Sequence, residues 1–398
     1  MGKILSTFKK IDLVDIKFLF RFLVCQLPAL VLKLFKKDIW LICERYDTAE
    51  DNGWILYQWI RKNHPEQDIY FILSKKGKRD KEAVEGPDDQ IVVWSSWRHC
   101  LLYLAARLLI KTMFPPPRPC RRLCDYYVKY IKRYPVVYLR HGISTSGVEH
   151  HHYKVQGARL FICGAKPEYD YISKSAGYPE GYVQYTGFAR FDDLLKNQRD
   201  ERFVLIMPTW RRYIVSPENT QQENEQAFVQ STYFHHFQSL LNNTELMDYI
   251  EQAGYRVKFY IHAEFSSYLH LFDKVDPRVE MIKGGVTVHD LLMSCSLLIT
   301  DYSSVFFDVA YMKKPMVFYQ FDFEEFRAKH ISEGYFSYRR HGMGPVVETQ
   351  AELLEAIRAF NVDGKFVNTD FYLQRCDAFF PAHDNHNCER IYRAIKEI

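Results

Sequence analysis

The sequence predicts an α/β protein in which two Rossmann-like domains face each other across a cleft, preceded by a helical segment that lies at a membrane interface. Three observations support this fold class. The chain has 398 residues, a length typical of two or three domains. Hydrophobic residues make up 47% of it and charged residues 26%, which suits buried cores and excludes a disordered or collagen-like chain. Short apolar runs alternate with amphipathic stretches in two successive series, as in parallel β/α folds.

The first series occupies residues 38–198 and is expected to form the N-terminal domain. Apolar runs predict strands, and the periodic segments between them predict helices. Ser95 or Ser96 is placed to cap one helix, and Pro167 suits the first turn of another. The expected strands are residues 38–43, 69–73, 91–94, 136–139 and 160–163, and the expected helices are residues 52–62, 100–109 and 167–172.

A polar run at residues 194–201 marks the boundary with the second domain, residues 199–398. The same alternation continues there, so this domain is also expected to contain a parallel sheet. The expected strands are residues 203–207, 256–261, 279–282, 297–300 and 316–319, and the expected helices are residues 234–253, 288–294 and 305–312.

The net charge of +4 hides an uneven distribution. Residues 1–37 carry eight Lys or Arg against two Asp, and residues 111–133 carry seven against one. Each segment therefore has a net charge of +6, and the rest of the chain has a net charge of −8. We expect residues 1–37 to bind an anionic membrane surface as a basic amphipathic segment.

The apolar run in this segment, residues 22–32, is too short to span a bilayer, which needs about 20 residues, and it contains Pro28. An interfacial position is therefore expected. The alternative is a helix that packs on its own domain or on a partner. The apolar side chains expected to enter the interface are Phe18, Leu19, Phe22, Leu23, Leu30, Val31 and Leu34.

Residues 111–134 form a basic insert in which prolines precede tyrosines interleaved with Lys and Arg. This composition suits a lipid headgroup interface or an anionic ligand, and no nucleic-acid-binding motif accompanies it. The nine cysteines are scattered, which favours a reducing compartment over a disulfide framework. No spacing of cysteines and histidines predicts a metal site, and no cofactor is expected.

Candidate binding residues follow the predicted strand at residues 297–300, because ligands of open parallel sheets bind beyond the carboxyl ends of the strands. Asp301, Ser303 and Ser304 stand at the start of the next predicted helix, where free N–H groups and hydroxyls can hold a phosphate. Asp308 comes one turn later and faces either the same cleft or solvent. The alternative is that these residues are ordinary helix caps.

Other strand ends carry cationic and imidazole side chains. Arg211 follows one strand and suits bidentate phosphate binding. His141 and His262 follow two others and suit general base work or oxyanion stabilisation. Alone, each has the alternative of a surface arginine or a structural histidine; together they predict a site. The usual ATP-binding, dinucleotide-binding and serine-hydrolase motifs are absent from the sequence.

Residues 298–319, with Asp-Tyr-Ser-Ser at 301–304, resemble the hallmark segment of the CDP-glycerol glycerophosphotransferase family of teichoic acid and capsule enzymes. The resemblance covers residues 38–395. Further matching segments, in the same order, are Asp51-Asn52-Gly53, residues 139–142, residues 186–192, residues 207–211 and residues 322–326.

The resemblance implies a GT-B fold with a CDP-alditol in the C-terminal half and the acceptor approaching from the N-terminal half. It implies that His141 is the general base on the acceptor hydroxyl. It also implies that Arg211 and His262 hold the pyrophosphate and stabilise the departing CMP phosphate. It implies that Ser303 and Ser304, with Asp301 nearby, form the donor-binding helix start. The predicted donor-binding residues are these three together with Thr209, Thr300 and Asp308.

On this basis we expect an enzyme that transfers a polyol phosphate, glycerol phosphate first of all, from CDP-glycerol or CDP-ribitol to a lipid-linked or polymeric acceptor, with release of CMP and without a metal. We expect peripheral attachment to the cytoplasmic face of the cell membrane. The alternatives are a ribitolphosphotransferase, a GT-B glycosyltransferase that uses a nucleotide sugar, and a non-enzymatic, membrane-docked protein that binds an anionic polymer.

Overall fold

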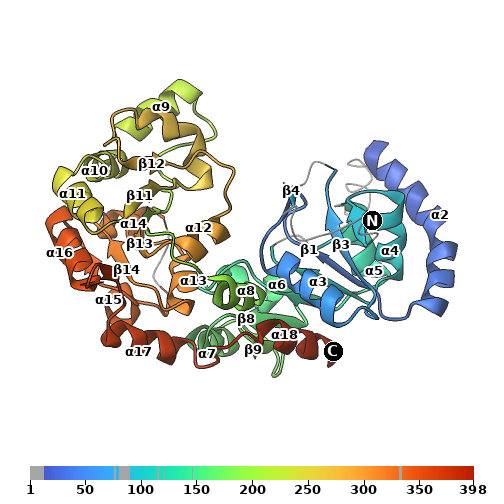
Figure 1. Cartoon of the computed structure of the whole chain (residues 1–398). Helices are drawn as coiled ribbons and strands as arrows, with labels where there is room; N and C mark the ends of the chain where they lie inside the picture. The colour runs from blue at the N-terminus through green and yellow to red at the C-terminus, as the bar shows by residue number, and fades with distance from the viewer. Residues whose placement is uncertain are drawn as a thin grey trace.

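The computed structural model describes residues 13–75, 78–79, 90–113, 116–120, 122–145, 147–330 and 334–398. It contains two α/β domains, each built on one parallel sheet with helices packed against it (Figure 1). The predicted fold class, two Rossmann-like domains, is confirmed.

The N-terminal sheet has seven parallel strands in the order β5-β3-β1-β6-β7-β8-β9. Along β1, Trp40 and Ile42 join one core cluster, and Leu41 and Cys43 join another on the opposite face. Both faces are covered, so the central strands are apolar throughout, as parallel sheets require. The strands are β1 Trp40–Cys43, β3 Ile69–Leu73, β5 Ile91–Val93, β6 Leu108–Lys111, β7 Val136–Tyr138, β8 Leu160–Cys163 and β9 Val183–Tyr185.

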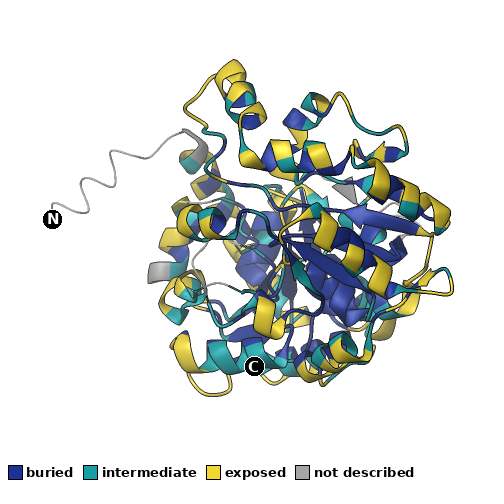
Figure 2. Cartoon of the chain, turned by 90° about the vertical axis from the view of Figure 1, so that its left-hand side faces the viewer, coloured by how far each residue is buried: buried dark blue, intermediate teal, exposed yellow. Residues whose placement is uncertain are grey.

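The C-terminal sheet has six parallel strands in the order β12-β11-β10-β13-β14-β15. Figure 2 shows dark-blue strands enclosed by helices whose outward turns are yellow, the pattern of a sheet buried on both faces. The strands are β10 Phe203–Ile206, β11 Arg256–Phe259, β12 Val279–Met281, β13 Leu297–Thr300, β14 Met316–Tyr319 and β15 Val346–Val347. Two small ribbons complete the strands: β2 Thr48–Ala49 with β4 Lys78–Arg79, and β16 Asn361–Val362 with β17 Lys365–Phe366.

The helices connect the strands and cover the sheets. They are α2 Leu13–Phe35, α3 Asn52–Asn63, α4 Trp97–Ala105, α5 Arg122–Tyr130, α6 Tyr153–Gln156, α7 Lys166–Ser175, α8 Ala189–Asn197, α9 Gln221–Val229, α10 Thr232–Leu240, α11 Thr244–Gln252, α12 Val288–Ser294, α13 Phe306–Tyr311, α14 Phe323–Lys329, α15 Tyr338–His341, α16 Gln350–Phe360, α17 Asp370–Phe379 and α18 Asn387–Lys396. Two 3₁₀ helices, Glu149–His151 and Ala263–Leu271, are also present.

Two sequence predictions about these elements are wrong. The helix expected at residues 100–109 ends at Ala105, and residues 108–111 form β6 between β1 and β7. A short apolar run has no periodicity that separates a strand from the end of a helix. The helix expected at residues 234–253 is two helices, α10 and α11, because the side chain of Asn243 caps a new helix start. Strands β9 and β15 were not predicted.

The two domains are joined by packing as well as by the chain. Phe191 of α8 stacks on Tyr311 of α13, with ring centroids 4.2 Å apart, and these helices meet at the centre of Figure 1. The last helix, α18, returns to the N-terminal domain, where Tyr392 stacks on His64 at 3.9 Å. The C-terminal end of the chain thus stabilises the first domain, although the domain boundary predicted from the sequence assigns it to the second.

Helix α2 has one packed face and one exposed apolar face. Phe18 and Phe22, two of the side chains expected in a membrane interface, are buried against α4 and α5 instead. The opposite face exposes Leu23, Leu27 and Leu34 by 64%, 71% and 73%. Contrary to the sequence prediction, the helix continues through Pro28, and residues 15–35 are long and apolar enough to cross a membrane, by length and composition only. Residues 1–12 of the predicted membrane segment lie outside the described residues.

The basic insert predicted at residues 111–134 does not form a single exposed patch. Lys111 belongs to β6 and is buried, with Nζ 2.8 Å from Oε1 of Gln156. Tyr127 and Tyr134 are buried near α2, whereas Tyr126 and Tyr130 are exposed on α5. Residues 114–115 and 121 lie outside the described part of the chain. Helix α5 therefore packs on α2 through Tyr127 and exposes Tyr126 and Tyr130.

Candidate active site

The strand order of each sheet indicates where a ligand binds. In both sheets the chain first builds strands toward one edge and then continues on the other side of the first strand, so β1/β6 and β10/β13 are topological switch points. Ligands of open α/β sheets bind beyond the carboxyl ends of the strands at such points. All the predicted site residues except Asp308 lie at the end of a strand or in the loop after it. Each of these strands is either at one of the two switch points or next to a strand that is.

His141 follows β7 and presents its imidazole to solvent. Its side chain is 66% exposed, whereas the preceding Arg140 is buried and forms an ion pair with Glu168 at 3.2 Å. Arg140 adopts a left-handed backbone conformation with φ of 68°, which is uncommon for a residue other than glycine and is found at functional sites. This local turn places adjacent side chains in different environments, one inside the domain and one at its surface.

Asp51 holds the imidazole of His141. Its Oδ2 lies 2.6 Å from His141 Nδ1. The negative charge of Asp51 and this hydrogen bond raise the pKa of His141. Burial alone would raise the pKa of Asp51, but the positive charges of His141 and Arg190 outweigh burial and lower it to about 2. When the neutral imidazole carries its proton on Nδ1 and donates a hydrogen bond to Asp51, its Nε2 is free to accept a proton.

Arg190 connects Asp51 to the other domain. Its Nη1 donates to Asp51 Oδ1 at 3.1 Å and to the carbonyl oxygen of His141 at 2.6 Å. Its Nε and Nη2 each donate to the carboxylate of Asp308 on α13 at 2.9 Å. From the sequence, Asp308 is predicted to bind the donor, whereas Asp51 and Arg190 have no predicted role. Asp51 and Arg190 both lie in segments that match the family, and this was the signal that could have identified them as site residues.

The turn before α13 lies beside His141. Ser303 is half-buried and Ser304 is exposed, and α13 begins at Phe306, so both serines belong to the turn and not to the helix. A Cβ placed on Gly142 would lie 3.3 Å from Ser304 Oγ. The predicted donor-side turn and the predicted base are therefore brought together at the junction between the domains.

His262 is the second imidazole at this junction. Its ring stacks on Trp210 at 6.2 Å and 24°, and its Nδ1 accepts the N–H of Glu264 at 3.2 Å. Burial lowers its pKa, and the positive charges of Arg45 and His141 act in the same direction. A neutral ring whose Nδ1 accepts carries its proton on Nε2, so His262 can donate a hydrogen bond to an anion. The Nε2 atoms of the two neutral rings thus differ, because that of His141 can accept a hydrogen bond and that of His262 can donate one.

Arg211 lies inside the C-terminal domain. Its side chain has no exposed surface, and it pairs with Asp301 Oδ2 at 2.9 Å and with Asp322 Oδ2 at 2.8 Å. Its Nη1 donates to the carbonyl oxygen of Thr209 at 2.7 Å. In this arrangement Arg211 braces the loops after β10, β13 and β14, and its contact with a pyrophosphate stays a prediction.

Asp301, Thr300 and Thr209 are also buried. Asp301 Oδ1 accepts the N–H groups of Thr209 and Tyr302 at 2.8 Å and 2.6 Å. Thr300 donates its hydroxyl to the carbonyl oxygen of Met207 at 2.7 Å. The hydroxyl of Thr209 is buried and has no hydrogen-bond partner among the described residues. These contacts fix the shape of the loops that carry Ser303 and Ser304.

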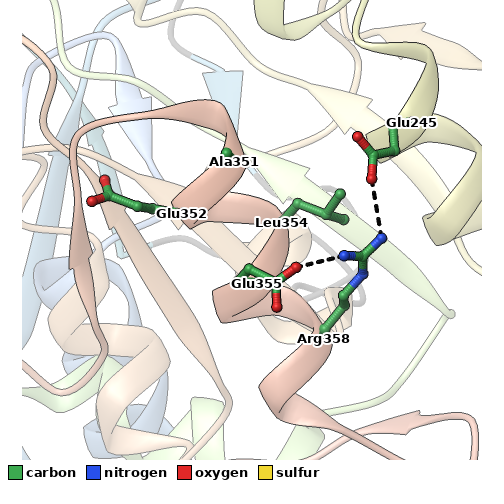
Figure 3. Close-up of a pocket in the computed structure, with 6 residues that line it drawn as sticks. All are labelled: Glu245, Ala351, Glu352, Leu354, Glu355 and Arg358. Atoms are coloured by element: carbon green, nitrogen blue, oxygen red, sulfur yellow. Dashed lines mark hydrogen bonds and ion pairs between the residues drawn. The ribbon is translucent and has the colours of Figure 1, made fainter.

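A pocket of about 410 Å³ lies elsewhere, between α11 and α16 (Figure 3). Arg358 bridges Glu245 and Glu355 across it, at 3.2 Å and 2.5 Å. These helices lie on the side of the C-terminal domain away from the N-terminal domain (Figure 1). Three glutamates, Glu245, Glu352 and Glu355, line this pocket together with one arginine, and none of the predicted site residues lines it. Within the described ranges, no group of three His, Cys, Asp or Glu side chains is arranged to hold a metal ion.

Comparisons with known proteins relate both the sequence and the fold to teichoic acid enzymes. The chain is 30% identical over 370 residues to the minor teichoic acid biosynthesis protein GgaB of Bacillus subtilis, covering 91% of this chain and 40% of that protein. It is 24% identical to the teichoic acid poly(glycerol phosphate) polymerase of Bacillus subtilis, covering 76% of this chain and 41% of that protein. The chain thus spans about two fifths of the length of these relatives.

Solved structures with the same fold include the wall teichoic acid polymerase TagF, with a TM-score of 0.64 at 16% identity over 95% of this chain and 98% of that one. The UDP-GlcNAc 2-epimerase of Methanocaldococcus jannaschii has a TM-score of 0.54 at 13% identity, over 91% of this chain and 100% of that one. The sequence pattern of the CDP-glycerol:poly(glycerophosphate) glycerophosphotransferase family matches residues 26–397. The chain is therefore a member of the CDP-glycerol:poly(glycerophosphate) glycerophosphotransferase family.

Proposed function

We propose that this chain transfers glycerol phosphate from CDP-glycerol to a hydroxyl of a teichoic acid or capsule acceptor and releases CMP. The observation that carries the proposal is the position of His141: an exposed imidazole, held by Asp51 at 2.6 Å, beside the Ser303-Ser304 turn of the other domain. Family membership and the names of the relatives support the substrate class.

This geometry supports the following reaction. An acceptor hydroxyl loses its proton to Nε2 of His141 while its oxygen attacks the β-phosphorus of the CDP-alditol. The bond from that phosphorus to the bridging oxygen breaks, and CMP leaves with the electron pair. The Nε2–H group of His262 donates a hydrogen bond to the phosphate oxygens as their negative charge grows. Such a transfer depends on positioning and on electrostatic stabilisation.

The test is CMP release from CDP-glycerol, CDP-ribitol and UDP-sugars in the presence of a polyol-phosphate polymer or its lipid-linked precursor. The expected result is release from CDP-glycerol, with loss of about 10²–10⁴-fold in His141→Gln because a positioned base contributes that much. His150→Gln, a change at an exposed histidine of the 3₁₀ helix Glu149–His151, is the control. Release from CDP-ribitol alone would change the donor, whereas release only from UDP-sugars, or full activity of His141→Gln, would overturn the proposal.

The exposed face of α2 supports a further part of the proposal, attachment to the cytoplasmic face of the cell membrane. Phe18, Phe22, Cys25 and Ala29 hold one side of the helix on the domain, so the helix cannot cross a bilayer without leaving it. The opposite side exposes a continuous apolar surface, and this arrangement suits a helix that lies flat in the interface. A lipid-linked acceptor would then reach the site from that surface.

A further inference from the structure

The N-terminus of α3 uses an unusual capping arrangement. Asp51 occupies the N-cap position, where an aspartate ordinarily accepts N–H groups of its own helix, yet its side chain makes no capping hydrogen bond. Glu44 takes over this task. Its carboxylate accepts the N–H groups of Glu50, Asp51 and Trp54 at 3.0 Å, 2.9 Å and 2.7 Å. The carboxylate of Asp51 is thereby left to pair with His141 and Arg190.

Arg190 is committed entirely to the same group of residues. Its side chain is 9% exposed, and its guanidinium donates to Asp51, to the carbonyl oxygen of His141 and, in a bidentate pair, to Asp308. Its backbone N–H donates to Asn52 Oδ1 at 3.1 Å, and Asn52 Nδ2 donates to the carbonyl oxygen of Arg140 at 2.9 Å. The turn that carries His141 is therefore fixed through both its side chain and its backbone.

The net charge of these groups favours the protonated form of His141. Asp51 and Asp308 are two anions, Arg190 is one cation, and His141 changes between neutral and positive. When the imidazole is neutral the four groups have a net charge of −1, and when it has taken a proton they are balanced. A largely buried cluster with an unpaired charge is costly. Proton transfer from a hydroxyl to His141 removes that imbalance.

We infer that Asp51 and Arg190 are positioning residues for His141, and that the Arg190–Asp308 pair makes the orientation of His141 depend on helix α13 of the donor-side domain. The inference rests on the proposed function. It reassigns Asp308 from contact with the donor to contact between domains. The position of α13 and the orientation of the His141 imidazole then change together, because Arg190 lies between two carboxylates from different domains.

The first test is Asp51→Asn in the full chain, which keeps the size of the side chain and removes its charge. The expected result is a loss of about 10²-fold in kcat with little change in the KM for CDP-glycerol, since the base and not the donor is misplaced. The acidic limb of the pH profile of kcat/KM moves to lower pH. The charged or titratable groups that face His141 are Asp51, Arg190, Arg45 and His262, and Asp51 alone among them is an anion.

A matched control distinguishes positioning from stability. Asp192 lies on α8, two residues from Arg190, and its carboxylate accepts the N–H groups of Asn387 and Cys388 at 2.8 Å each. Asp192→Asn weakens packing between α8 and α18 without touching His141. We expect it to lower the free energy of unfolding and to leave the pH profile in place. Equal pH profiles for Asp51→Asn and the wild type would overturn the inference.

The domain coupling has its own test. Asp308→Asn should reduce kcat in the wild type but change it by less than about twofold in the Asp51→Asn background, because groups in one network are not additive. Full additivity would refute the coupling. The pKa of His141, measured by NMR and assigned with His141→Gln, provides a readout that needs no turnover. A fall of that pKa in Asp51→Asn supports the inference even if no CDP-alditol is a substrate, and an unchanged pKa refutes it even if one is.

Discussion

Replacement of Arg211 by alanine tests whether this arginine braces the C-terminal domain or binds the donor directly. The guanidinium has no exposed surface and pairs with Asp301 and Asp322, which are themselves buried. Removal of one partner from a buried ion pair costs about 3–5 kcal/mol, because the remaining charge is left without compensation. Two carboxylates lose their partner here, so we expect a loss toward the upper end of that range.

The assay is thermal and urea unfolding of the full chain, with CMP release measured below the transition. For a domain of this size, about 3–5 kcal/mol corresponds to a fall in Tm of about 6–20 °C. Arg212→Ala is the control, because Arg212 is exposed and its Nε donates only to the carbonyl oxygen of Lys329. Wild-type stability of Arg211→Ala together with a raised KM for CDP-glycerol would refute this reasoning and place Arg211 on the donor.

Three further predictions concern pH and the membrane. First, kcat/KM should fall as the pH drops through the raised pKa of His141, because only the neutral imidazole accepts a proton; a flat profile from pH 5 to pH 8 would contradict the assignment of the base. Second, the pKa of Asp51, about 2 in the folded chain, lies below its unfolded value. The ionised Asp51 carboxylate therefore contributes about 2–3 kcal/mol to the free energy of unfolding above pH 4, and this contribution is lost as the pH falls toward 2. In urea unfolding, the free energy of unfolding of Asp51→Asn should fall less steeply with decreasing pH than that of the wild type. An equal fall in both proteins would refute this dependence on Asp51. Third, Leu27→Glu should reduce sedimentation with anionic vesicles, whereas Val155→Glu, a similar change at an exposed residue of α6, should not; equal sedimentation of both variants would count against α2 as the membrane surface.

The alternation of apolar and amphipathic segments along the sequence was sufficient by itself to determine much of this fold. It placed β3, β8, β13 and β14 at their observed bounds, because these strands are short, buried and set off by helical segments. It also put His141, His262 and the Ser303-Ser304 turn just past strand ends. Parallel strands share one orientation, so strand ends alone were sufficient to indicate on which edge of each sheet these residues lie.

Only the tertiary structure decided what each of these residues contacts. Arg211 and Ser304 both follow strands, yet one is buried between two aspartates and the other is exposed beside Gly142. The pairing of Asp51 with His141 joins residues 90 positions apart, and that of Arg190 with Asp308 joins residues 118 apart. Local periodicity reports which face of an element is buried, but it carries no information about which distant charge lies opposite. The pairing of Asp51 with His141 is set by packing within the N-terminal domain, and that of Arg190 with Asp308 by the packing of α8 against α13.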